Sequence, residues 1–224
     1  MRHGYLLSAL LLVAATSHAG VVINGTRLVY QGDKKESSLG LSNPDATDYL
    51  VQSWVDSGGK NPAKAPFLIT PPLFRLDAKE DNVLRVVRTG GNLPEDRESL
   101  YWLNIKAIPS SKHVEGVNTL QIAINTRIKL LYRPSAITGK PDAVADKLQW
   151  HREGHDLVVN NPTPFYMNFQ MVMLNGHKVD KATWAVPKTE THFALPDNAS
   201  GSTVTYSIIT DYGSISQTWS ASVH

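Results

Sequence analysis

Cysteine is absent from all 224 residues of the chain. Without it there is no thiol nucleophile, no cysteine-ligated metal site and no disulfide to hold a small core together. The fold must therefore be held by the packing of apolar side chains, which a chain of this length supplies.

Signatures of catalysis are absent as well. The sequence contains no GxSxG, no phosphate-binding GxxxxGKS or GxxxxGKT, and no HExxH. His151 and His155 lie four residues apart, but Gly154 between them argues against the helix that would align them on one metal ion, and we expect an exposed turn. The sequence therefore predicts no enzyme activity, no use of ATP, no cofactor and no metal.

Charge of one sign is not in excess either, since 22 Lys and Arg stand against 20 Asp and Glu. Nucleic-acid-binding proteins gather basic residues into a patch or stripe and are strongly basic overall. We expect no nucleic-acid partner. A basic residue that binds a ligand in this protein must therefore do so at an individual position and not as part of a basic patch.

Long apolar runs are limited to the N-terminus. Basic residues at positions 2 and 3 precede the apolar run Tyr5–Ala15, and Ser17-His18-Ala19 follows. This order is typical of a secretory signal peptide, and the run is too short to cross a membrane as a helix. We expect cleavage after Ala19, which leaves 205 of the 224 residues, enough for two domains of about 100 residues each.

Helical periodicity is scarce, and short β-type runs recur between turn residues. Before Ser135 the predicted strands are Val21–Tyr30, Glu36–Ser42, Tyr49–Val55, Phe67–Thr70, Asn82–Thr89, Leu100–Ala107 and part of Thr119–Pro134. Strands at this spacing, separated by Gly, Pro, Asn and Asp, are typical of an immunoglobulin-like β-sandwich.

Residues 135–141 contain Pro and Gly and interrupt this pattern. After them we expect one or two helical turns over Asp142–Leu148, and a hairpin turn at Asn175-Gly176. The later predicted strands are Asp156–Asn160, Phe165–Leu174, Thr191–Leu195, Thr203–Thr210 and Ile215–Val223. The prediction is an all-β chain with a signal peptide (1–19), an N-terminal immunoglobulin-like domain (20–134), a linker (135–141) and a C-terminal β-sandwich (142–224).

Thr119–Pro134 is the longest β-type run in the chain. Leu120, Ile122 and Ile124 alternate with polar or small residues, which gives a strand one apolar face. Composition alone favours an ordinary strand whose apolar face packs in the core. The alternative is an edge strand whose apolar row is offered to another chain.

Residues 93–111, LPEDRESLYWLNIKAIPSS, decide between the two interpretations. The features that count are Leu93-Pro94, the charge pattern Asp96-Arg97-Glu98, Trp102, Asn104 and Ile108-Pro109. This stretch resembles the signature of the periplasmic pilus chaperones of the chaperone–usher pathway. The likeness covers the whole chain after residue 19 and is closest to chaperones of type 1-like fimbriae. It implies two immunoglobulin-like sandwiches set at an angle, with a cleft between them.

The resemblance also implies a function. Chaperones of this family are non-enzymatic proteins of the periplasm that work without ATP. They bind fimbrial (pilin) subunits, both major and minor and the adhesin, by donating a strand to each subunit, and they deliver the subunits to an outer-membrane usher. The donor strand here would use Leu120, Ile122 and Ile124. Because a bare edge invites self-association, we expect the free chaperone to hide it, for example by dimerising.

Arg27 and Lys129 resemble the family's pair of cations that binds the C-terminal carboxylate of the subunit. Two charge-assisted contacts at one point would set the register of every later side chain. Lys129 differs in parity from Leu120, Ile122 and Ile124, so a flat strand would place them on opposite faces. We expect twist or a bulge to rotate the strand between them.

Two further sets of residues follow from the resemblance. Glu98, Arg133 and Asp211 match an interdomain charge network that would fix the angle between the sandwiches. The positions that match the usher-docking patch are Leu50, Gln52, Thr70, Pro71, Pro72 and Leu73, although Leu50 also fits a core position.

Two other classes of protein are alternatives to this one. A secreted carbohydrate-binding or adhesin-type β-sandwich would gather exposed aromatic residues with acidic or amide groups at loop tips, whereas the Trp residues here lie mostly in predicted strands. A secreted hydrolase would need a catalytic constellation that the sequence does not show. Neither class accounts for the motif at residues 93–111.

Overall fold

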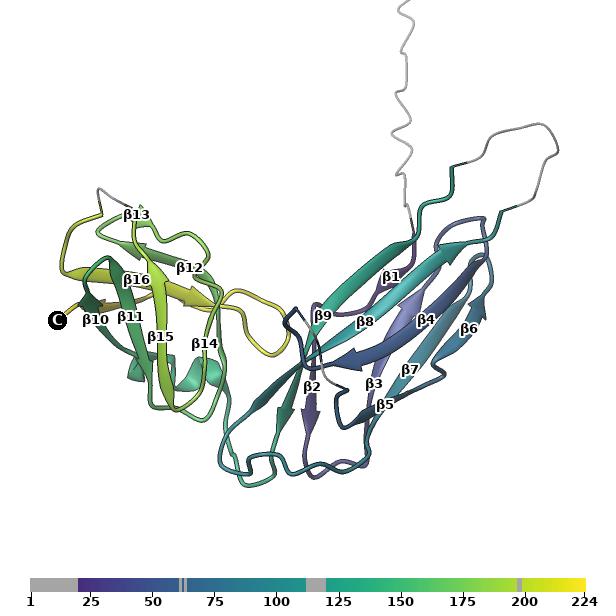
Figure 1. Ribbon diagram of the computed structural model, residues 1–224, viewed down its shortest axis with the longest axis horizontal. Helices are drawn as coiled ribbons and strands as arrows, with labels where there is room; N and C mark the ends of the chain where they lie inside the picture. Colours follow the sequence, from purple (N-terminus) through teal and green to yellow (C-terminus); the bar gives the residue numbers. More distant parts are fainter. Residues whose placement is uncertain (1–19, 61, 63, 112–119, 197–198) are drawn as a thin grey trace, which may run out of the picture.

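The computed structural model describes residues 20–60, 62, 64–111, 120–196 and 199–224. The predicted signal peptide, residues 1–19, lies outside the described residues, and so does Thr119. The described chain folds into two β-sandwiches arranged like the arms of a V, with β1–β9 in one and β10–β17 in the other (Figure 1). The prediction of an all-β chain with two sandwiches is confirmed.

The first sandwich packs a four-stranded sheet against a five-stranded sheet. In sheet order, the four strands are β1 (Val22–Ile23), β3 (Glu36–Ser42), β7 (Asp81–Arg88) and β5 (Phe67–Thr70). The five strands are β2 (Arg27–Gln31), β9 (Ile124–Arg133), β8 (Ser99–Pro109), β4 (Tyr49–Asp56) and β6 (Leu73–Leu76). Buried leucines and valines from both sheets, such as Val51, Leu84 and Leu130, form the core between them.

The prediction of one strand over Val21–Tyr30 is wrong, because the structure has two strands there in different sheets. The Gly25 N–H donates to the Ile23 carbonyl over 2.9 Å, and this tight turn moves the chain from one sheet to the other. Ile23 and Leu28 both pack against the same core, so the apolar pattern continues through the turn and does not reveal it.

β6 has no counterpart among the predicted strands. It follows Pro71-Pro72, which ends β5, and the chain then resumes pairing in the other sheet beside β4. The prolines therefore mark a change of sheet and not the end of strand structure.

The second sandwich packs a three-stranded sheet against a five-stranded sheet. The three strands are β10 (Gln149–Glu153), β11 (Asp156–Asn161) and β15 (Thr189–Ala194). The others are β13 (His177–Lys178), β12 (Met167–Leu174), β16 (Thr203–Ile208) and β17 (Trp219–Ser222), with β14 (Trp184–Ala185) also paired to β12. Buried aromatic rings, among them Trp150, Phe169 and Tyr206, fill its core.

Smaller features of this half agree with the sequence. Two 3-10 turns, η1 (Pro141–Ala143) and η2 (Ala145–Lys147), occupy the segment where one or two helical turns are predicted. Asn175 and Gly176 have φ of 45° and 83° and form the two-residue turn between β12 and β13. His155 lies in the exposed turn between β10 and β11, whereas His151 is a half-buried residue of β10, so the expectation of an exposed turn is wrong for His151. Within the described part of the chain, no helix is long and apolar enough to cross a membrane.

Candidate functional site

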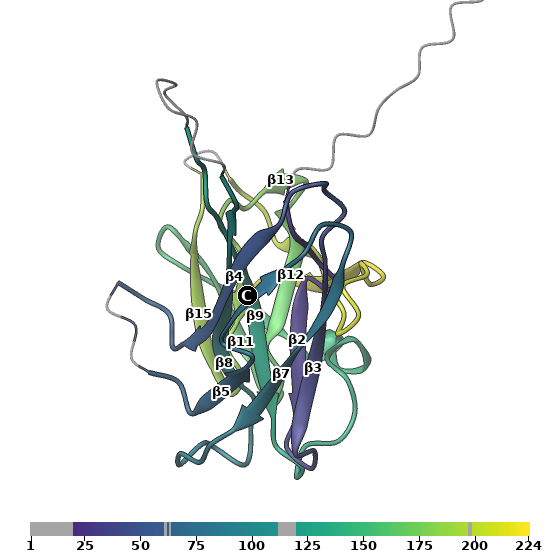
Figure 2. The ribbon, with the colours of Figure 1, turned by 90° about the vertical axis from the view of Figure 1, so that its right-hand side faces the viewer.

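β9 has a neighbouring strand along its whole length on one side only. β8 pairs with it from Ser99↔Tyr132 to Ala107↔Ile124, whereas β2 pairs only with Lys129–Arg133. Figures 1 and 2 show β9 between these two strands. Over residues 124–128 the edge of β9 opposite β8 therefore has no strand beside it among the described residues. Backbone groups on such an edge are open to pairing with another chain.

The apolar row of this segment changes from exposed to buried along the chain. Leu120 is 88% exposed, Ile122 64% and Ile124 49%, whereas Ile128 is only 7% exposed. The same face of the chain thus supplies core residues at one end and exposed apolar residues at the other. An ordinary core role for the first three residues is excluded.

The strand is shorter than predicted, because Leu120 and Ile122 precede β9, which begins at Ile124. If the register with β8 continued, Pro109 would lie opposite Ile122, and proline has no N–H to donate. The Gln121 side chain donates instead to the Pro109 carbonyl. The ladder therefore stops before the two most exposed members of the row.

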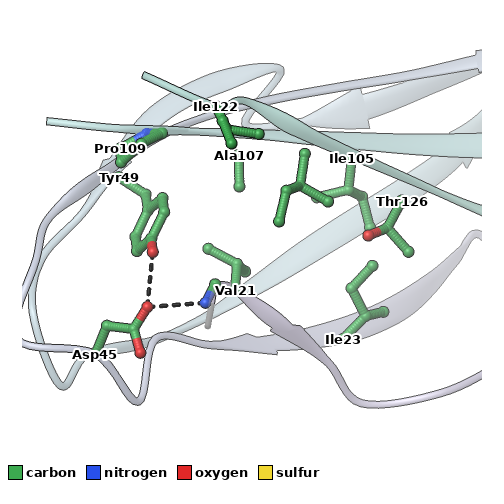
Figure 3. Close-up of a pocket in the computed structure, with 11 residues that line it drawn as sticks. Val21, Ile23, Asp45, Tyr49, Ile105, Ala107, Pro109, Ile122 and Thr126 are labelled. Carbon is green, nitrogen blue, oxygen red and sulfur yellow. Dashed lines mark hydrogen bonds between the residues drawn. The ribbon is translucent and has the colours of Figure 1, made fainter. Parts of the chain in front are cut away.

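Ile122 and Ile124 also line an open pocket of about 510 Å³ between the two sheets of the first sandwich. Val21 and Ile23 form one wall of this pocket, and Ile105 of β8 lies across from them on the side of Ile122 (Figure 3). The row therefore faces the space between the sheets. An apolar group that enters from a partner would extend the core of this sandwich.

Lys129 lies on the opposite face of β9 from this row. The register between β8 and β9 contains no shift, so no bulge rotates the strand between Ile124 and Lys129. The expectation that twist or a bulge brings Lys129 to the face of the apolar row is wrong. Even-numbered positions such as Ile128 face the first sandwich's own core. Odd-numbered positions such as Lys129 and Arg133 contact the second sandwich.

Arg27 and Lys129 are register partners in the parallel ladder between β2 and β9, so their side chains share one face. Lys129 Nζ donates to Asn168 Oδ1 over 2.5 Å and lies 4.4 Å from the centroid of the Trp184 ring. Arg27 Nη1 donates to the Ile209 carbonyl over 3.2 Å. The buried Arg27 Nε has no hydrogen-bond partner among the described residues.

Lys129 differs from the other cations on its face of β9. Arg127 Nη2 lies 2.7 Å from Asp56 Oδ1, and Arg133 is paired with two carboxylates. Between them, Lys129 contacts an amide oxygen and an aromatic ring but no carboxylate of the described chain. A carboxylate is the ligand that would complete this position.

Burial, together with the positive charge of Arg27, lowers the pKa of Lys129 to about 8. Burial also lowers the pKa of Arg27, although the charge of Asp211 opposes that shift. The charged forms of both side chains are therefore disfavoured in the free protein. A carboxylate that binds here would favour the charged forms and raise both pKa values.

Asn168 of β12 and Trp184 of β14 are contacts of Lys129 that the sequence analysis does not include. They are register partners in the second sandwich, so they present their side chains next to each other. The Trp184 ring lies 6.2 Å from the ring of Trp102, a residue of the motif at positions 93–111. Trp102, Lys129 and Trp184 line a hollow of about 450 Å³ between the two sandwiches. Trp102 and Lys129 are register partners of β8 and β9, and the second sandwich adds Trp184 to them.

Arg133 connects the two sandwiches. It donates to Glu98 Oε1 over 2.8 Å and to the two oxygens of Asp211 over 2.8 and 2.9 Å. Glu98 Oε2 accepts from the Tyr166 N–H over 2.8 Å. Burial raises the pKa of the Glu98 carboxyl, and the charge of Arg133 opposes that shift. The structure thus brings the three residues of the expected charge network into direct contact.

The residues expected to dock on the usher gather on the outer side of β4, β6 and the turn before β6. Leu50 is 43% exposed and Leu73 56% exposed, so Leu50 is not a core residue. Gln52 lies opposite Leu73 in the ladder. The Ser53 N–H donates to the Pro72 carbonyl over 2.9 Å, which holds the turn of residues 70–72 against β4.

The two sandwiches are joined by a buried charge network, and a free strand edge lies beside two cations that form no ion pair among the described residues. These features define a chaperone that presents a strand to its client. Named proteins with similar sequences agree. "Probable fimbrial chaperone LpfB" of Escherichia coli O157:H7 is 42% identical over 212 residues, which cover 93% of this chain and 91% of LpfB. "Chaperone protein FimC" of Escherichia coli K12 is 42% identical over 220 residues, which cover 95% of this chain and 88% of FimC.

Family models and solved structures give the same result. The model of the "Pili and flagellar-assembly chaperone, PapD N-terminal domain" matches residues 20–138, and that of the "Pili assembly chaperone PapD, C-terminal domain" matches residues 143–220. A chain of the Salmonella enterica SafA pilin–SafB chaperone complex has a TM-score of 0.85 and 38% identity, with 93% of this chain and 98% of that chain covered. The chain belongs to the PapD family of pilus-assembly chaperones.

Proposed function

We propose that this chaperone captures fimbrial subunits in the periplasm by adding the segment from Leu120 into β9 as a strand to the incomplete sandwich of the subunit, and that it delivers them to an outer-membrane usher. The proposal includes cleavage after Ala19. It involves no catalysis, no ATP and no cofactor. The observation that carries it is the free edge of β9 beside Arg27 and Lys129, neither of which forms an ion pair with a carboxylate of the described residues. The solved complex of the related SafB chaperone with a pilin supports the choice of client.

The C-terminal carboxylate of the subunit binds between Arg27 and Lys129 in this scheme. At Lys129 Nζ it takes the position that the Asn168 amide oxygen holds in the free protein. A charge-assisted contact of this kind contributes about 1.5–3 kcal/mol. Because the two cations are fixed on paired strands, the anchored carboxylate sets the register of the subunit strand against β9.

The exposed row then enters the groove of the subunit. Leu120, Ile122 and Ile124 each contribute about 1.5–3 kcal/mol if they become fully buried. Hydrogen bonds along the free edge of residues 124–128 hold the two strands together. The carboxylate anchor and the apolar row lie on opposite faces of β9, so the subunit strand must run along the free edge of β9 to reach both. Its C-terminus then lies at the hollow between the two sandwiches, and its apolar groups lie next to the pocket between the two sheets.

The charge network of Arg133 orients the second sandwich. Since a buried ion pair contributes little net stability compared with apolar packing, its value lies in fixing geometry. It keeps Asn168 and Trp184 close to Lys129, which completes the anchor site from the other sandwich.

Usher docking uses the opposite edge of the same sheet. In the order β2-β9-β8-β4-β6, the capture edge is at one side, and the exposed patch of Leu50 and Leu73 is at the other. A subunit on β9 therefore leaves the patch uncovered. The complex as a whole is presented to the usher.

Co-expression with a fimbrial subunit and purification from the periplasm tests the proposal. The expected result is a stoichiometric complex that dissociates when Lys129 is replaced. A chaperone that is recovered alone in the presence of a soluble subunit contradicts it. Binding to a glycan array in place of a subunit would favour the carbohydrate-binding alternative.

A further inference from the structure

Asp45 holds the first described residue of the chain. The Gly20 backbone nitrogen donates to Asp45 Oδ2 over 2.8 Å, and the Tyr49 hydroxyl donates to the same oxygen over 2.6 Å (Figure 3). Gly20 is buried and Asp45 half-buried. A carboxylate is thus aimed at the backbone nitrogen of a buried glycine.

The position of this carboxylate is fixed by its surroundings. The Asp45 N–H donates to Asn43 Oδ1 over 3.1 Å, and the Asn43 amide donates to the carbonyls of Thr47 and Asp77, each over 2.8 Å. The Tyr49 ring is a core residue at the start of β4. Asp45 therefore lies on a turn at the end of the sandwich whose position is fixed by its own hydrogen bonds and does not depend on the N-terminal segment.

We propose that Asp45 is the binding site for the α-ammonium group of Gly20, which forms when residues 1–19 are removed. This inference rests on the cleavage included in the proposed function. Before cleavage the Gly20 nitrogen is a neutral amide with one N–H. After cleavage it carries a positive charge and three N–H donors, so the contact with Asp45 becomes an ion pair with charge-assisted hydrogen bonds.

The ion pair has a consequence for the capture edge. Gly20, Val21 and Ile23 line the same pocket as Ile122 and Ile124. A Cβ atom built on Gly20 would lie 3.8 Å from Ile124 Cδ1, so the two segments are in van der Waals range. Cleavage therefore fixes the N-terminal segment as a wall beside the apolar row. Removal of residues 1–19 thus helps to form the surface that captures the subunit.

Titration of the α-amine tests the site directly. The protein is purified from the periplasm, its N-terminus is identified by mass spectrometry, and the pKa of the ¹⁵N-labelled Gly20 amine is measured by NMR. An exposed α-amine has a pKa of about 8, and the carboxylate should raise it by about one unit or more. Other groups near the amine are Tyr49, whose pKa is raised to about 12 by burial and Asp45, and Lys79, whose ammonium contacts the Pro44 carbonyl.

Matched variants assign the shift to Asp45. Asp45→Asn should return the pKa of the amine to its ordinary value, whereas Tyr49→Phe, which keeps the carboxylate, and Asp33→Asn, a distant surface change, should retain the raised pKa. A form that starts with an added Met before Gly20 moves the ammonium by one residue and should also lose the shift.

The outcomes separate this inference from the proposed function. An N-terminus other than Gly20, or an ordinary pKa for the Gly20 amine in the wild type, overturns the Asp45 site. A raised pKa in a protein that fails to capture subunits upholds the site and contradicts the proposed function.

Discussion

Arg27 lies directly opposite Lys129 in the parallel ladder between β2 and β9, so two cations that repel each other share one face of neighbouring strands. Burial lowers the pKa of each, and each is therefore less stable as a cation than in water. These two cations therefore destabilise the free fold at the position where a carboxylate would bind. Substitution of either residue, or a change of pH, should reveal this destabilisation.

Lys129→Ala should reduce subunit capture by about 10- to 100-fold, which corresponds to the loss of a charge-assisted contact of about 1.5–3 kcal/mol. The variant should melt at or slightly above the wild-type temperature, because a half-buried charge that has no carboxylate partner among the described residues is removed. Pull-down from periplasm and thermal melts measure the two effects. Arg27→Ala should behave alike, and the double variant should lose less than the sum.

Arg127→Ala is the matched control for this prediction. It removes a cation from the same face of β9, but one that is already paired with Asp56. Capture should therefore be retained. A normal complex yield from Lys129→Ala, or an equal loss in both variants, would contradict the anchor assignment.

Capture should weaken as the pH rises above about 8, because the pKa of Lys129 in the free protein is lowered to about 8 and the carboxylate needs the ammonium form. The stability of the free fold should change in the opposite direction. Between about pH 8 and the ordinary lysine value of 10.5, the unfolded chain keeps a proton that the folded one has lost, so stability rises with pH. Subunit binding and melting temperature, followed from pH 7 to about 10, should both lose this dependence in Lys129→Ala.

Ile122→Glu should abolish subunit capture while it changes the melting temperature by only a few degrees, because Ile122 is 64% exposed. Ile128→Glu is the matched control on the same row. Ile128 is 7% exposed, and an unpaired carboxylate there costs several kcal/mol of the roughly 5–15 kcal/mol that stabilise a domain. A large drop in melting temperature for Ile122→Glu would show that the row belongs to the core of the chaperone.

Leu73→Glu should leave subunit capture intact but stop pilus assembly, so that chaperone–subunit complexes accumulate in the periplasm. Leu73 is 56% exposed at the edge of the sheet farthest from β2. Val83→Glu, an exposed position on β7 of the other sheet, should permit assembly. Loss of subunit binding in Leu73→Glu would assign this patch to capture.

The sequence predicts local features of the fold well. The bounds predicted for β3 and β5 agree with the structure, as does the turn at Asn175 and Gly176, because alternation and turn residues are local signals. The break between β1 and β2 is hidden in the apolar pattern, because both strands pack against one core, and its only local signal is the turn dipeptide Asn24-Gly25.

The candidate site is only partly visible in the sequence. Arg27 and Lys129 are picked out by the family resemblance, but Asn168 and Trp184 approach Lys129 only after the second sandwich folds and docks. The contact between Gly20 and Asp45 joins residues that lie 25 positions apart and share no motif. Such contacts depend on tertiary structure, and period and spacing carry no signal for them.

Pro109 affects which substitutions this protein can accept during evolution. Because it ends the ladder opposite Ile122, the chain divides the apolar row into a part that stabilises its own fold and a part that does not. With Leu120 and Ile122 as the client-binding residues that we propose, substitutions at these two positions should alter the range of clients without loss of stability. The stability of the chaperone and its choice of client would then be free to evolve separately.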